Sequence, residues 1–213
     1  FDGITIDPRG HAQLCPVWSD EADHSLHDFT KSSTTIENIF YGERIKKIRE
    51  KMLNGEHINA CKYCYSREQH NLESKRIKYA MSRKRFTDDI TPKIKYLDIS
   101  FSNQCNLGCV MCNSIHSSHW HQQEKSMPEK ARNALKTHYD YNQFKPVTLQ
   151  KEVLESILDN INDLELLIIK GGEPLYDKNC LAFLDKISNV KPTLKIRMVS
   201  NITAISKKTL ETF

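Results

Sequence analysis

The stretch Cys105-Asn106-Leu107-Gly108-Cys109-Val110-Met111-Cys112 follows an apolar segment, 96–101, whose composition predicts a β-strand. Its three cysteines have the spacing C-x3-C-x2-C, so their thiolates can converge on one metal centre, and the nearest other cysteines are distant in sequence. A four-iron cluster that only carries electrons takes four protein thiolates. Three thiolates on one short loop therefore predict a centre with one coordination position left open.

A second motif, Gly171-Gly172-Glu173-Pro174, follows another apolar segment, 164–169. A nearly continuous apolar run is typical of a parallel strand buried on both faces, and the carboxyl ends of such strands carry the sites of α/β folds. Glycines let a ligand approach the backbone closely, and Glu173 offers a negative acceptor for an ammonium group. Taken alone, however, the four residues would make an ordinary strand-to-helix turn.

From Ile94 onward, strand-like and helix-like segments alternate, which is the pattern of a parallel sheet with crossover helices. We predict a helix that Thr148 caps, a second helix over 178–190 with Cys180 as a core thiol, and a third strand over 194–198. Lys195 and Arg197 alternate with the apolar residues of that strand and face either the interior or solvent. The polar segment 117–146 gives no clear prediction. The apolar faces of the two helices consist of Val153, Leu154, Ile157, Leu158 and Ile161, and of Leu181, Leu184 and Ile187.

Together, the two motifs resemble the signature of radical SAM enzymes, where SAM is S-adenosylmethionine. The resemblance implies a [4Fe-4S] cluster on Cys105, Cys109 and Cys112, whose open iron chelates SAM, with the SAM ammonium group at Gly171–Pro174. Asn201 resembles the asparagine of a Thr-Asn-Gly stretch found at this place in many relatives, although the chain has Ser-Asn-Ile here. The implied fold is a partial (β/α)6 barrel, of which this chain supplies the first three βα units.

The same resemblance implies an enzyme of the oxidoreductase type. A reductant such as flavodoxin or ferredoxin delivers an electron, SAM is cleaved to methionine and a 5′-deoxyadenosyl radical, and that radical abstracts a hydrogen from the substrate. The chain begins with Phe1 and ends inside an expected helix, and later barrel units are absent. We therefore expect a fragment of a longer enzyme.

The N-terminal part carries a second group of cysteines. Cys15 stands at the exit of a hairpin predicted over 4–14, and Cys61 and Cys64 form a C-x2-C knuckle. Between them, apolar residues over 36–53 recur at helical spacings, which predicts one or two short helices.

A hairpin cysteine, a helix and then a C-x2-C knuckle resemble the twitch domain, a shortened SPASM domain that holds an auxiliary iron-sulfur cluster. Glu68, Ser74 and Arg76 stand where such sequences often carry these residue types. We expect a small α+β twitch-like domain over 1–92 and the first half of the barrel over 93–213. The implied ligands of the auxiliary cluster are Cys15, Cys61 and Cys64, with His57, His70, a cysteine outside the chain or the substrate as the fourth.

The alternative from another class is a non-catalytic protein that binds zinc or an iron-sulfur centre. C-x2-C pairs are common zinc ligands, although structural zinc sites usually combine two paired knuckles, which the x3 spacing fits poorly. Three histidines that follow the cysteine loop, His116, His119 and His121, keep zinc open there. A zinc knuckle at Cys61 and Cys64 would only stabilise a domain with little core.

Composition fits a soluble protein, with 213 residues, 38% hydrophobic and 27% charged. No apolar run approaches the ~20 residues needed to cross a bilayer, and no secretory signal opens the chain. The seven cysteines, mostly in short-spaced groups, indicate metal ligands in a reducing compartment rather than disulfides. We therefore expect the cytoplasm and no membrane partner.

Net charge is only +4, yet basic residues gather at 75–85. Such a run is usually a solvated face. A functional alternative is a surface that guides an acidic peptide, or RNA, toward the site. Aromatic residues for base stacking are sparse there, with only Tyr79 and Phe86, so a peptide or protein substrate is favoured over RNA.

Overall fold

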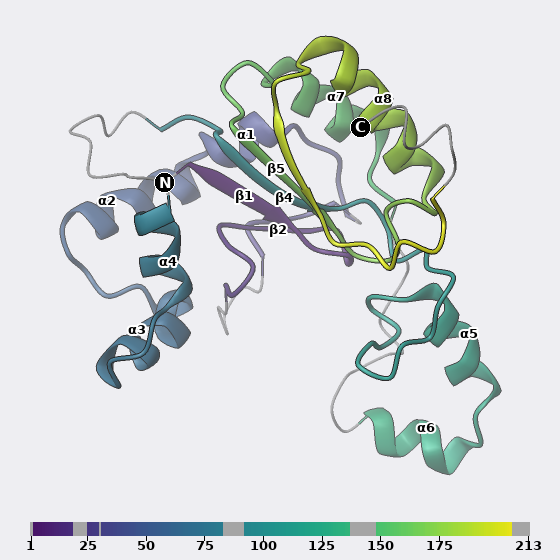
Figure 1. Cartoon of the computed structure of the whole chain (residues 1–213). Helices are drawn as coiled ribbons and strands as arrows, with labels where there is room; N and C mark the ends of the chain where they lie inside the picture. The colour runs from purple at the N-terminus through teal and green to yellow at the C-terminus, as the bar shows by residue number, and fades with distance from the viewer. Residues whose placement is uncertain (1, 19–24, 30, 83–91, 137–147, 206–213) are drawn as a thin grey trace.

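In a computed structural model, the described residues form a six-stranded sheet with helices on both sides (Figure 1). The structure describes residues 2–18, 25–29, 31–82, 92–136 and 148–205. The sheet order is β3-β2-β1-β4-β5-β6, in which β1, β4, β5 and β6 run parallel and β2 is antiparallel to both of its neighbours. The strands are β1 (Gly3–Ile6), β2 (His11–Gln13), β3 (His27–Asp28), β4 (Tyr96–Ser100), β5 (Leu166–Lys170) and β6 (Lys195–Met198).

The N-terminal hairpin is confirmed, and it joins the common sheet. Thr5 pairs with Gln13 across the hairpin, and the Asp7 carboxylate accepts the backbone N–H groups of Arg9 and His11 in the turn. On its other side, β1 runs parallel to β4, with Thr5 beside Asp98. The strands of the predicted twitch-like unit over 1–92 therefore continue the sheet of the predicted barrel unit. The two-domain division itself stays a prediction.

One face of the sheet is apolar because strand residues alternate between faces. Three helices cover it, α1 (Ile36–Phe40), α7 (Lys151–Asp159) and α8 (Lys178–Val190), as Figure 1 shows. Helix α8 has the predicted bounds, and Cys180 is fully buried as the core thiol that we predicted, whereas Leu181 is only half-buried. The strands contribute Ile4, Ile6, Leu97, Ile99, Leu167 and Ile169 to this core.

The opposite face of the sheet is polar. Thr5, Asp98 and Ser100 are buried on it, and Lys170 Nζ donates to Asp98 Oδ2 at 2.8 Å. Lys195 and Arg197 alternate with half-buried apolar residues of β6, are exposed, and lie by register on the same face of the sheet as Asp98.

The periodic segment 36–53 forms two helices, α1 and α2 (Glu43–Leu53), which meet at Tyr41 and Gly42. A 3-10 turn η1 (Asn59–Cys61), then α3 (Lys62–Gln69) and α4 (Lys75–Ser82), complete this part. Helix α4 reaches the sheet through the Tyr79 hydroxyl, which lies 3.0 Å from the Tyr96 hydroxyl.

The polar segment after the cysteines forms α5 (Ser118–Ser126) and α6 (Glu129–Lys136), which the sequence analysis did not predict. The predicted cap of α7 is wrong, because Gln150 and not Thr148 precedes its first turn. Leu149 explains the later start: its side chain is buried in the core and its N–H donates to Phe101 O at 3.0 Å, which holds the chain extended. None of the helices in the described ranges is long and apolar enough to cross a membrane.

Candidate metal centre

The cysteine loop leaves the carboxyl end of β4 through a buried, hydrogen-bonded segment. Ser102 Oγ donates to the Asp177 carboxylate, and Asn103 Nδ2 donates to Ser114 O at 3.0 Å. Asp177 also caps α8 by accepting the N–H groups of Asn179 and Cys180. The base of the loop is therefore fixed to the helix that follows β5.

The amino end of α5 holds the loop itself. Cys105 N–H donates to Ser118 Oγ at 3.0 Å, Ser117 Oγ donates to Leu107 O at 2.8 Å, and Trp120 Nε1 donates to Cys109 O at 2.7 Å. The sequence analysis did not assign these residues a role. The pair Ser117-Ser118 has the composition of a helix N-cap, and this signal would have pointed to the start of α5.

The three thiols lie at the surface end of this frame. Cys105 and Cys112 are half-buried, Cys109 is exposed, and none of the three is in a disulfide. Leu107 N–H points at Cys105 Sγ with 3.5 Å between nitrogen and sulfur, the kind of contact that tunes iron-sulfur ligands. Burial raises the pKa of the Cys112 thiol, and the neighbouring Cys109 and Cys105 raise it further. Metal binding must displace these protons.

Within the described part of the chain, no three His, Cys, Asp or Glu side chains gather around a single ion position. Of the histidines considered for zinc, His119 Nε2 lies 2.9 Å from Gln123 Nε2.

The Gly-Gly-Glu-Pro motif packs directly on the start of the cysteine loop. Gly172 N–H donates to His116 O at 3.1 Å, and Glu173 N–H donates to Gln104 O at 2.7 Å. Gly172 has φ +57°, and a Cβ there would lie 2.3 Å from Gln104 O. Only glycine fits this approach. The structure thus brings together the two motifs that the sequence places at neighbouring strand ends.

Glu173 is buried, and its carboxylate binds groups of the chain itself. Oε1 accepts from Leu175 N–H at 3.0 Å and from Ser200 Oγ at 2.6 Å, and Oε2 accepts from Asn201 N–H at 2.6 Å. A carboxylate has about four acceptor positions. Glu173 therefore links the ends of β5 and β6, and its expected contact with an ammonium group stays a prediction.

Asn201 connects β6 to the cysteine loop. Its Nδ2 donates to Asn106 Oδ1 at 3.1 Å, Asn106 Nδ2 donates to Thr203 Oγ1 at 2.8 Å, and Thr203 Oγ1 donates to Asn201 Oδ1 at 2.7 Å. Asn106 and Thr203 were not predicted. Ile202, where the related stretch has glycine, has φ +62°, a conformation that glycine adopts without strain.

Two thiols of the second cysteine group lie on one hydrophobic cluster. Cys15 and Cys61 pack against one apolar cluster, which contains Trp18, Ile58 and Ala60. The pKa of the Cys15 thiol is raised to about 11, mainly by burial, with smaller contributions from the charges of Cys61 and Cys64. The candidates for a fourth ligand, His57 and His70, are exposed, so the structure does not choose between them.

The three residues that support the twitch resemblance interact with one another. Glu68 accepts hydrogen bonds from Ser74 Oγ at 2.5 Å and from the Arg76 guanidinium, and the Arg76 guanidinium also lies 4.8 Å from the Tyr65 ring centre. The Arg76 contact holds the pKa of the Glu68 carboxyl below its usual value, with a further contribution from Ser74. This network ties α4 to α3, the helix that carries Cys64.

Comparison with known proteins gives one distant similarity. The chain is 25% identical over 121 residues to GTP 3′,8-cyclase of Thermodesulfovibrio yellowstonii, a match that covers 56% of this chain and 31% of that protein. The chain thus matches about a third of the length of this relative. No family model matches the chain. No solved structure matches it either. The similarity to the cyclase suggests the radical SAM superfamily.

Proposed function

We propose that this chain is part of a radical SAM enzyme, with a [4Fe-4S] cluster on Cys105, Cys109 and Cys112. One observation carries the proposal: the three-thiol loop after β4 and the Gly-Gly-Glu-Pro turn after β5 are hydrogen-bonded to each other at adjacent strand ends. Substrate sites of parallel sheets lie at this edge. When bound, the cluster would supply the electron that cleaves SAM reductively.

The chain's own residues would position these cofactors. Ser117, Ser118 and Trp120 hold the loop backbone so that the three thiols present themselves at its outer side. Gly172 keeps a side chain out of the space beside Gln104, and Gly171 does the same beside Ser100. Asn201 is our candidate for a contact with SAM. Protein residues orient and enclose the reactants, and the cofactors carry the difficult chemistry.

The finer parts of the proposal are an auxiliary iron-sulfur cluster on Cys15, Cys61 and Cys64, electrons from a flavodoxin or ferredoxin, and a peptide or protein substrate. Packing of Cys15 and Cys61 on one apolar cluster supports the auxiliary site. The cationic residues of α4, which follow this site in the chain, support an acidic peptide.

The test is the formation of 5′-deoxyadenosine from SAM by anaerobically reconstituted protein in the presence of dithionite. We expect formation by the full-length enzyme that contains this chain and none by its variant in which Cys105, Cys109 and Cys112 are all alanine. A variant with Cys180→Ala is the matched control, because this thiol lies in the core. Cleavage of SAM by the triple variant would refute the proposed function.

A further inference from the structure

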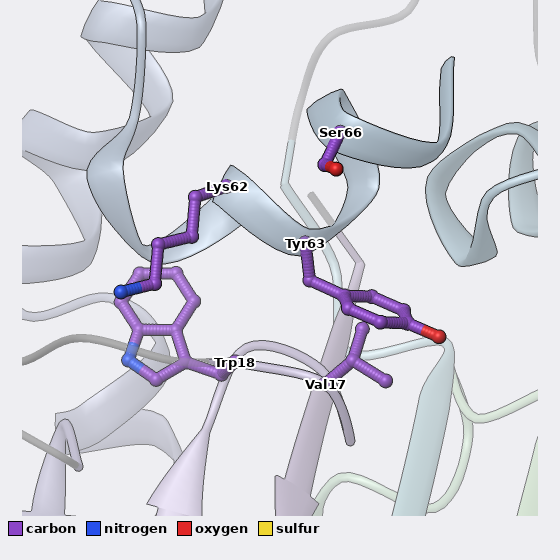
Figure 2. A pocket seen from close by; sticks show the side chains of 5 residues that line it. All are labelled: Val17, Trp18, Lys62, Tyr63 and Ser66. Atoms are coloured by element: carbon purple, nitrogen blue, oxygen red, sulfur yellow. The ribbon is translucent and has the colours of Figure 1, made fainter. Parts of the chain in front are cut away.

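A groove opens beside the second cysteine group. Its larger part is a cavity of about 590 Å³ lined by Val17, Trp18, Lys62, Tyr63 and Ser66. Figure 2 shows Trp18 and Lys62 toward one end of this cavity and Val17 with Tyr63 toward the other. This volume lies within the range of ligand pockets, about 300–1,000 Å³.

A second cavity of about 290 Å³ continues the groove, because Val17 and Tyr63 line both. Its remaining walls come from the end of α3, from the segment that joins α3 to α4, and from the first part of α4. They are mostly polar or charged, and consist of Arg67, Glu73, Ser74, Lys75 and Lys78.

The two parts of the groove differ in chemistry. The first is apolar, since the Tyr63 ring is 49% exposed and lies over the cavity that Val17 and Trp18 line. The second is cationic, because its single carboxylate, Glu73, lies 3.9 Å from Lys78 and cannot balance the neighbouring Arg67 and Lys75. A partner that fits both parts carries an apolar side chain and several negative charges.

We propose that this groove, lined by Val17, Trp18, Tyr63, Arg67, Lys75 and Lys78, docks an acidic peptide segment that places an apolar side chain between Trp18 and Tyr63. The groove adjoins Cys15 and Cys64 in the chain, so a docked peptide lies beside the second cysteine group.

Single-stranded RNA fits this surface less well. Stacking platforms present successive exposed aromatic rings to successive bases. Of the two aromatic rings here, Trp18 is only 8% exposed, which leaves Tyr63. The peptide assignment deepens the proposed function, but docking itself requires neither cluster nor SAM.

Docking is measured by fluorescence anisotropy with a short fluorescein-labelled peptide of glutamates around one central leucine. We expect the double variant Lys75→Glu and Lys78→Glu to weaken peptide binding by about tenfold or more. The control is the double variant Lys47→Glu and Lys51→Glu, at exposed positions of α2, which should change peptide binding by less than about threefold. A peptide with serine in place of leucine should bind more weakly, since it leaves the apolar cavity empty.

Three outcomes would overturn the docking proposal: no binding of the peptide, equal losses in the two double variants, or binding of labelled oligouridine in place of the peptide. SAM cleavage by the same protein samples is measured in parallel. Loss of peptide binding with intact SAM cleavage rejects the docking site alone, whereas loss of SAM cleavage with intact peptide binding rejects the proposed function alone.

Discussion

At the scale of single residues, the site depends on a few backbone conformations and buried polar contacts. Ile202 has a positive φ although its side chain is β-branched, and it is 65% exposed. A non-glycine residue in this region costs on the order of 1–3 kcal/mol, and surrounding structure must compensate. Here Asn201 and Thr203, which flank Ile202, are fixed by hydrogen bonds.

We therefore expect Ile202→Gly to stabilise the protein by roughly 1 kcal/mol, because relief of backbone strain exceeds the entropy cost of glycine. Urea unfolding measures the change. The control is Ile202→Ala, which keeps a Cβ and should retain most of the strain. Equal stabilities of the glycine and alanine variants would show that the backbone at residue 202 is unstrained.

Glu173 gives a second prediction at this scale. Glu173→Gln should lower the free energy of unfolding of the metal-free protein by about 2–3 kcal/mol, because the amide nitrogen must replace one of two acceptors. It faces either the Leu175 N–H and Ser200 hydroxyl at the Oε1 position or the Asn201 N–H at the Oε2 position, and it accepts neither. Chemical unfolding without iron or SAM checks it. An unchanged stability would mean that Glu173 serves a ligand and not the structure.

At the scale of elements, the contact between the cysteine loop and the turn after β5 is the decisive junction. Gly172→Ala would place a Cβ against Gln104 O and push the two loops apart. We expect a loss of more than about 2 kcal/mol in stability and a lower iron content after reconstitution.

The matched control is Gly55→Ala. Gly55 also has a positive φ, +72°, but a Cβ there would meet nothing within 4 Å. Gly55→Ala therefore measures the effect of backbone strain alone, without a close contact to another loop, and we expect it to leave iron binding unchanged. Similar losses of iron in the two variants would show that the close approach at Gly172 does not position the cysteine loop.

The elements differ in how far the sequence predicts them. Helix α8 was predicted to its ends because its apolar residues repeat regularly after Asp177, which caps it. Helices α5 and α6 were not predicted, because their sequences are polar and few of their residues enter the core. The start of α7 depends on a contact of Leu149 with Phe101, the residue after β4, which no local pattern reveals.

Sequence-based prediction of the site meets the same limit: it finds local patterns and misses contacts between distant residues. The cysteine spacing and the Gly-Gly-Glu-Pro motif are local patterns, and their placement after two strands predicts that they meet. The hydrogen bonds of Asn106 with Asn201 and Thr203 join residues 95 and 97 positions apart. Such pairings follow from strand order and loop geometry, so a single sequence does not predict them.

At the scale of the whole molecule, one sheet carries two separate cysteine groups. The hairpin that ends near Cys15 belongs to the same sheet as β4, whose loop carries the first group. We expect replacement of Cys15, Cys61 and Cys64 by alanine to remove the iron of one centre and leave the other. Iron and acid-labile sulfide analysis of the purified variant tests this. Zinc in the wild type at this position would reject the auxiliary cluster.

The most direct test of the account is the electron paramagnetic resonance spectrum of the reduced protein before and after addition of SAM. An open iron on three thiolates predicts a SAM-dependent spectral change in the wild type and in the Cys15, Cys61 and Cys64 variant. The same account predicts no SAM-dependent change when Cys105, Cys109 and Cys112 are alanine. A spectrum that responds to SAM without those three cysteines, or a wild-type protein that binds zinc and gives no iron-sulfur signal, would contradict it.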